Sequence, residues 1–200
     1  MRAGLAFWAG VIGAAVMVLG MWIARALDLT GFNFGYFWGS LFTGTTTVGS
    51  WILGFVITLI LGGLIALIYA AVFEAIGRSS WGWGVLGGVA HLIIGGLVIG
   101  WIARAHPAIP NVISDPGYYT ANFGWPSVFA FSFLHLIFGA IVGGMYYPIH
   151  KRIAVPRGRL TEEHPVGVVH DEEDISVPSA REDRTVEDRS AVKLGDRGRR

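Results

Sequence analysis

The sequence predicts an all-α polytopic membrane protein in which four transmembrane helices form a glycine-rich bundle, followed by a disordered tail. Composition is the first observation behind this prediction. The 200 residues are 53% hydrophobic, with a mean hydropathy of +0.55 and 29 glycines, which favours helices in a bilayer over a soluble domain. Charge is the second, because only seven charged side chains precede residue 149: Arg2, Arg25, Asp28, Glu74, Arg78, Arg104 and Asp115.

Four apolar segments are the third observation, and they cover about residues 4–24, 51–74, 80–103 and 126–148. Each is close to the roughly 20 residues that a helix needs to cross about 30 Å of hydrocarbon. The first apolar run exceeds the about 7–15 residues of a signal-peptide core, which favours a retained helix. Aromatic side chains lie where the helix ends would meet the lipid headgroups, and they are Trp22, Trp51, Trp81, Trp83, Trp101, Trp125, Tyr146 and Tyr147.

The connections differ in length and character. Residues 77–80 predict a tight turn, whereas residues 104–125 predict a longer loop. The stretch GFNFGYFWGSLFTGTTTVGS (31–50) is too rich in glycine and polar residues for a span. Its aromatic residues indicate a segment that lies in the outer interface or dips into it, and a short re-entrant element stays open.

The charges also predict orientation and domain organisation. Arg2, Arg78 and the basic cluster that begins at Lys151 fall on one side of the membrane, against Arg25 and Arg104 on the other. Cytoplasmic loops carry the excess of basic residues, so we expect a multi-pass protein of the cytoplasmic membrane with both termini inside. The tail, residues 149–200, mixes both charges with few large apolar residues and is expected to be disordered beside the transmembrane domain, residues 1–148.

One decapeptide is written almost twice, as HLIIGGLVIG (91–100) and HLIFGAIVGG (135–144). A fainter copy, TLILGGLIAL (58–67), carries Thr58 in place of the histidine. Such a helix-level repeat indicates equivalent packing environments. Small residues let helices approach closely in lipid, so we expect the packing positions to include Gly62, Gly95, Gly139 and Gly143.

The two repeated histidines are expected near the middle of the bilayer. His91 follows Trp83 by eight residues, and His135 follows Trp125 by ten, which places each ring about 12–16 Å from its aromatic belts. Neighbouring third and fourth helices would bring the two imidazoles to one height. An ionisable group at that depth is costly and marks a candidate site.

Three interpretations of His91 and His135 are open from the residues. Neutral imidazoles would hydrogen-bond across helices to Thr58, Ser132, a carbonyl group or each other. Alternatively, they would form a proton, ion or small-solute pathway, with Glu74 at its inner end. As a third interpretation, paired imidazoles on neighbouring helices would ligate haem b. We expect no cofactor under the first interpretation, and the metal content is unknown.

The remaining candidates are weaker and predict no enzyme. Glu74 is expected to be an interfacial carboxylate near Arg78, while His106 and Asp115 in the outer loop offer a single possible pairing. The chain has no cysteine and contains no nucleophile elbow, phosphate loop or zinc-protease motif. We therefore expect a non-catalytic bundle whose partners are the lipid bilayer and a second copy or another membrane protein, with no nucleic acid.

Several pieces together resemble a family of small, functionally uncharacterised prokaryotic four-helix membrane proteins. They are LGGLIALIYAAVFEAIG (61–77), AHLIIGGLVIG (90–100), His106-Pro107, Asp115-Pro116-Gly117-Tyr118 and LHLIFGAIVGGMYYP (134–148). The resemblance implies the four-helix fold and no particular activity. It also implies a histidine four residues before a glycine in the second helix. This chain has Leu59 before Gly63, or Thr58 before Gly62, at that spacing, and this departure argues against a three-histidine metal site.

Overall fold

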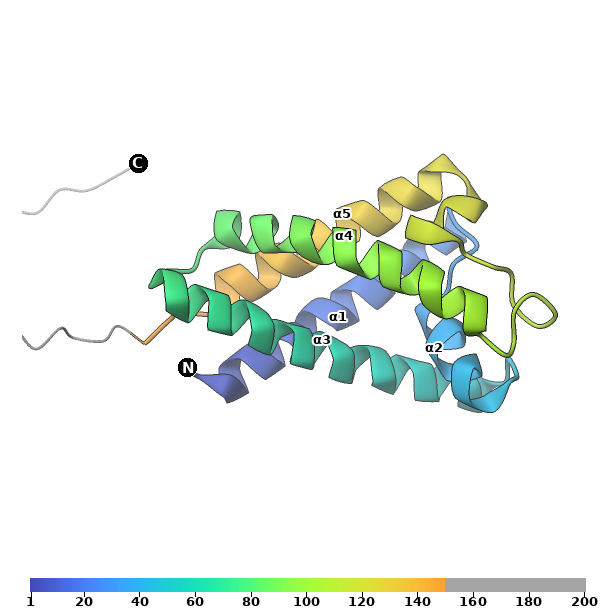
Figure 1. Cartoon of the computed structure of the whole chain (residues 1–200), viewed down its shortest axis with the longest axis horizontal. Helices are drawn as coiled ribbons and strands as arrows, with labels where there is room; N and C mark the ends of the chain where they lie inside the picture. Colours follow the sequence, from blue (N-terminus) through green and yellow to red (C-terminus); the bar gives the residue numbers. More distant parts are fainter. Residues whose placement is uncertain (150–200) are drawn as a thin grey trace, which may run out of the picture. The chain divides into compact units, whose positions relative to one another are not determined.

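The computed structural model describes residues 1–149, so the predicted disordered tail lies outside the described residues. Every regular element in that part of the chain is helical (Figure 1). The elements are α1 (Ala3–Ala26), α2 (Phe34–Thr43), α3 (Val48–Ile76), α4 (Trp81–Ala105), the 3-10 helix η1 (Tyr118–Phe123) and α5 (Trp125–Met145). Four of them, α1, α3, α4 and α5, are long and apolar enough to cross a membrane. The predicted all-α fold with four spans is confirmed.

The ends of the spans follow from local capping chemistry. Thr47 accepts a hydrogen bond from the backbone N–H of Ser50 and begins α3, three residues before the predicted start. Gly77 ends α3 with a φ of 75°, a left-handed conformation that glycine adopts without a steric penalty. Helix α5 ends at Met145, three residues before the predicted end of the last span near residue 148. Pro148 lacks an N–H and disfavours helical geometry in the residue before it.

The spans form two layers. In Figure 1, α3 and α4 lie in front of α1 and α5. Helix α1 packs against α3 and α5, and α5 packs against α4. Within the described residues, the backbones of α3 and α4 are not closely packed, although only a short turn joins them. The Tyr69 side chain of α3 reaches across to Gly87 of α4.

Glycine pairs bring the packed helices into backbone contact. A Cβ atom added at Gly10 of α1 would overlap the carbonyl group of Gly62 in α3. Likewise, a Cβ atom at Gly84 of α4 would overlap the carbonyl oxygen of Gly139 in α5. A Cβ at Gly143 would lie 2.7 Å from the backbone nitrogen of Gly84. The small-residue contacts expected for helices in lipid therefore occur at three of the four predicted packing glycines.

The segment between the first two spans, for which the sequence predicts an interfacial segment or a short re-entrant element, contains the short helix α2. Asn33 begins it by accepting a hydrogen bond from the N–H of Tyr36, and Gly44 ends it with a φ of 65°. Its ten residues extend about 15 Å, which is too short to span a bilayer. The helix packs on α3, and its side chains Phe34 and Phe37 are buried.

The outward-facing surface of the spans is apolar. Large hydrophobic side chains such as Trp8, Ile60, Leu64 and Phe133 are exposed along their length. Apolar groups in water would be costly over such an area, whereas hydrocarbon solvates them. The exposed faces therefore fit a lipid bilayer.

Candidate functional site

A cleft of about 560 Å³ lies between α3 and α4, whose backbones are not closely packed. Its floor includes Ala14 and Met17 of α1 together with His135 and Phe138 of α5. Two side chains of α2, Phe34 and Trp38, line the end of the cleft nearest that helix. The exposed apolar side chains at its edges come from α3 and α4, and they are Ile68, Leu86 and Ile94.

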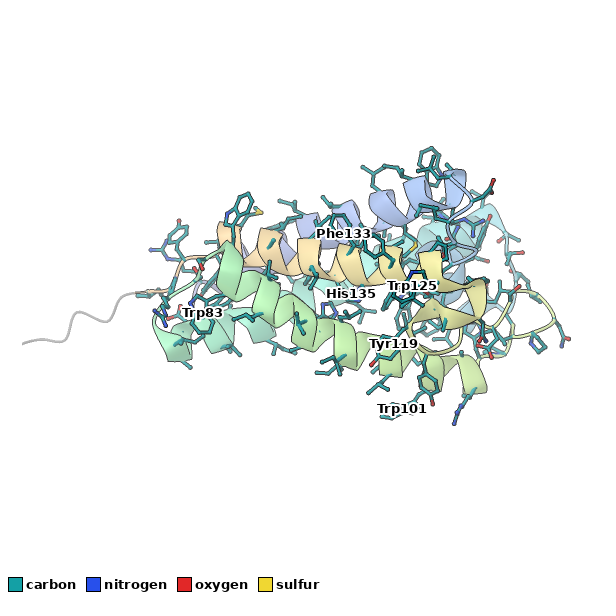
Figure 2. All side chains as sticks on the ribbon, turned by 90° about the horizontal axis from the view of Figure 1, so that it is seen from above. Trp83, Trp101, Tyr119, Trp125, Phe133 and His135 are labelled. Atoms are coloured by element: carbon teal, nitrogen blue, oxygen red, sulfur yellow. The ribbon has the colours of Figure 1, made fainter. Side chains whose placement is uncertain are left out.

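The two repeated histidines meet at this cleft. The ring centroids of His91 on α4 and His135 on α5 are 4.8 Å apart, and both residues line the cleft. In Figure 2, His135 lies between the ribbons of α5 and α4. The two helices run antiparallel and pack closely through glycine, which is why the same motif on each helix delivers a histidine to one place.

His135 is held in one tautomer by its own helix. Its side chain is 3% exposed, and its Nδ1–H donates to the carbonyl oxygen of Phe131 at 2.7 Å. The neutral ring therefore presents Nε2 as a hydrogen-bond acceptor. This nitrogen would lie 3.2 Å from a Cβ atom at Gly95, so Gly95 provides space for the imidazole instead of a backbone contact.

Two buried polar atoms in the same cluster have no partner among the described residues: Nδ1 of His91 and the hydroxyl group of Tyr69. The Tyr69 ring lies on α3 and its centroid is 6.3 Å from that of His91. Unpaired polar groups cost several kcal/mol each in a hydrocarbon environment, where no water replaces the missing bond. The sequence analysis did not identify Tyr69. The feature that could have indicated it is a tyrosine inside an apolar helix, away from the aromatic residues at the helix ends.

Thr58 lies on the cleft wall but does not pair with the histidines. Its hydroxyl group donates to the carbonyl oxygen of Gly54 at 2.7 Å, one turn earlier in α3. Of the two histidines, only His135 forms the hydrogen bond to a backbone carbonyl group that the first interpretation considered. In the described part of the chain, no hydrogen bond joins Thr58 to an imidazole.

Glu74 belongs to a separate polar cluster at the end of the bundle that contains the N-terminus. It accepts a hydrogen bond from the Tyr146 hydroxyl at 2.5 Å and lies 3.5 Å from the amino group of Met1. Among the described residues Glu74 forms no ion pair with Arg78, whose guanidinium lies over the Trp83 ring, 4.8 Å from its centroid. Burial and the hydrogen bond to Glu74 raise the pKa of the Tyr146 phenol, which keeps it a donor at neutral pH.

We expect Tyr146→Phe to lower the free energy of unfolding by about 1.5 kcal/mol, because a hydrogen bond to a charged acceptor is lost. Thermal unfolding in detergent measures the effect. Tyr147→Phe is the matched control, since Tyr147 is exposed and its ring, which lies 4.2 Å from the Arg2 guanidinium, is retained. Equal stabilities for the two variants would show that the Glu74 cluster does not secure the helix ends.

His106 and Asp115 do not meet in the structure. His106 is buried after α4, where its Nδ1 accepts from the N–H of Ala108 at 3.2 Å. Its proton is therefore on Nε2, which donates to the carbonyl oxygen of Phe37 in α2 at 2.8 Å. Asp115 accepts from the N–H of Gly117 at 2.8 Å. His106 thus joins α2 to the end of α4, and Asp115 forms a local turn.

The histidine pair does not fit a bis-imidazole haem in this arrangement. Two imidazoles on opposite faces of one iron place their centroids about 6 Å apart, since each nitrogen lies about 2 Å from the metal. The His91 and His135 centroids are closer, and their planes meet at 65°. Residues 1–149 contain no group of three His, Cys, Asp or Glu side chains that suits a metal ion.

The surroundings of the pair also disfavour a chain of proton carriers. The Phe131 ring lies 4.1 Å from His135 and the Phe138 ring 5.1 Å from His91, between centroids. Transmembrane proton pathways use successive ionisable groups or water. Apolar aromatic rings are therefore the direct neighbours of His135 and His91 on α5.

The fold and the site define a class: an integral, multi-pass helical membrane protein with an apolar cleft and a buried polar spot between two of its spans. No protein-family model, curated protein or solved structure matches the chain. The resemblance to small prokaryotic four-helix membrane proteins stays a prediction.

Proposed function

We propose that the protein binds a lipid-soluble small molecule, which enters the α3–α4 cleft sideways from the bilayer. The observation that carries this proposal is the unpaired polar spot within an otherwise apolar cleft. The Tyr69 hydroxyl and Nδ1 of His91 are covered in the ligand-free structure. A molecule that displaces the covering side chains and supplies a hydrogen-bonding group removes the cost of these unpaired atoms. Binding sites of this kind are apolar, with a few polar groups that set orientation, and have volumes of about 300–1,000 Å³.

The edges of the cleft support entry from the lipid. Ile68 on α3 and Leu86 and Ile94 on α4 are exposed and line the cleft. Because the backbones of α3 and α4 are not closely packed, a hydrophobic molecule can enter between them by displacing side chains such as Tyr69, without separating helix backbones. The proposed role is non-catalytic and requires no soluble partner.

The distribution of basic residues supports an orientation for this binding protein. Arg2 and Arg78 belong to the end of the bundle that contains Glu74, whereas Arg25 and Arg104 lie at the ends of α1 and α4 toward α2. With the basic cluster after residue 150, the first end carries the greater positive charge. We propose that this end faces the cytoplasm and that α2 lies on the opposite side of a cytoplasmic membrane.

Ala90→Phe tests the proposal by filling the cleft. Ala90 is exposed and lines the cleft, whereas its neighbour Val89 is exposed and does not line it. The probe is a ten-carbon alcohol bearing a photoreactive diazirine, added to the full chain in phospholipid nanodiscs. We expect labelling of cleft residues to saturate in the original protein and in Val89→Phe, and to fall at least tenfold in Ala90→Phe.

The same labelling separates a binding site from a lipid-facing surface. Adducts on Leu64, which faces outward, should rise in proportion to probe concentration in all three proteins. Linear labelling of the cleft, or unchanged saturation in Ala90→Phe, would contradict the proposal. Protection of the cleft by a second copy would appear as labelling that decreases as the chain-to-nanodisc ratio rises, and it would favour self-association.

A further inference from the structure

The geometry points to a quinone headgroup as the occupant of the polar spot, with one ring carbonyl held by Tyr69 and His91. This inference rests on the proposed function and names the class of molecule that the cleft takes. Tyr69 is 7% exposed, lines the cleft and has an unpaired hydroxyl group. Its O–H is a donor that requires an acceptor, and the carbonyl oxygen of a quinone is one.

The depth of the spot limits which molecules reach it. His91 lies eight residues into α4 from Trp83, and Tyr69 lies seven residues before the end of α3. Charged headgroups remain at the membrane surface because charge is costly inside hydrocarbon. A phospholipid therefore brings only acyl chains to this depth, whereas a neutral quinone ring carries its oxygens into the hydrocarbon.

The polar spot offers both kinds of hydrogen-bonding group. The Tyr69 hydroxyl donates, and Nε2 of His135 accepts because its Nδ1–H is bonded to Phe131. A quinone carbonyl needs a donor, and a quinol hydroxyl needs an acceptor as well. The spot therefore suits both forms of the headgroup, and the inference concerns binding alone.

Aromatic edges surround the spot. The Tyr69 ring lies against Gly87 and the His135 imidazole lies near Gly95, so these two glycines of α4 admit both polar rings. The Phe138 ring stands edge-on to the Tyr69 ring, with centroids 5.9 Å apart. Aromatic rings prefer such offset and edge contacts, which a quinone ring also makes. A covalent aldehyde ligand is disfavoured, because residues 1–149 contain no lysine to form a Schiff base.

The test uses a benzoquinone with a ten-carbon chain, labelled with ¹³C at its carbonyl groups, and the full chain in phospholipid nanodiscs. We expect it to displace the ten-carbon diazirine alcohol from the cleft, and one carbonyl infrared band to shift to lower wavenumber on binding. Tyr69→Phe should weaken quinone binding about tenfold and abolish the band shift. Tyr119→Phe is the control, since the Tyr119 hydroxyl donates to Ile93 and lies outside the cleft.

Tyr69→Phe also distinguishes lost recognition from lost folding. Removing an unpaired buried hydroxyl should raise the melting temperature of the ligand-free protein while it lowers quinone affinity. Saturable alcohol binding with no quinone displacement, or displacement that Tyr69→Phe leaves unchanged, would overturn the quinone inference and leave the proposed function standing. Absence of saturable alcohol binding in the original protein would overturn both.

Discussion

Gly84→Ala is expected to destabilise the bundle by about 3 kcal/mol, because one methyl group would force two backbones apart. The new Cβ atom would overlap the carbonyl oxygen of Gly139 and lie 2.9 Å from the Cα atom of Gly143. Backbone atoms within packed helices cannot rotate away as a flexible side chain does. The contact between α4 and α5 also holds the two histidines together, so we expect both stability and cleft labelling to fall.

Gly82→Ala provides the matched control on the same helix. The nearest atom to a Cβ at Gly82 is the Ser80 hydroxyl oxygen at 3.9 Å, which is ordinary contact. Alanine favours helix by about 0.5–1 kcal/mol over glycine, so this variant should be neutral or slightly more stable. Thermal unfolding of both variants in one detergent measures the difference. Similar melting temperatures would contradict the close approach of α4 and α5.

His106→Ala is expected to release α2 from the end of α4 and to cost about 3 kcal/mol of stability. The imidazole bridges the carbonyl oxygen of Phe37 and the N–H of Ala108, and its ring centroid lies 5.2 Å from that of Phe37. Its loss leaves a buried N–H without a partner and a void beside α2. Hydrogen exchange of the α2 amides should increase while exchange in the centres of α1 and α5 changes little.

His106→Asn separates the two halves of this bridge. An asparagine oxygen still accepts from the N–H of Ala108, two residues later, but the side chain is too short to reach α2. We therefore expect faster exchange in α2 with a smaller loss of global stability than in His106→Ala. Unchanged exchange in α2 for both variants would show that His106 does not hold this helix.

Release of α2 also connects to the proposed ligand site. Phe34 and Trp38 of α2 line the end of the cleft nearest that helix, and Phe34 is buried against its neighbours. Freeing the helix should widen that end. We therefore expect His106, which the sequence suggested as a candidate site residue, to affect the cleft through the position of α2.

Local features of the chain made the four spans and their approximate ends predictable. Apolar length decides whether a helix crosses hydrocarbon, and the observed starts and ends depend on nearby residues such as Thr47 and Gly77. The α2 helix was harder to predict, because its segment is rich in glycine and aromatic residues and is shorter than a span. Its stability comes from packing on α3.

The sequence by itself determined that this is a four-span helical membrane protein with two histidines part-way along glycine-rich spans, because length, hydropathy and residue spacing are properties of each segment. Only the tertiary structure decided that His91 and His135 meet, that Tyr69 joins them and that the backbones of α3 and α4 are not closely packed. The physical reason is that, in lipid, the pairing of helices depends on which small-residue faces come together. Every span carries such faces, so their pairing, and the cleft that it leaves, is a property of the assembled bundle.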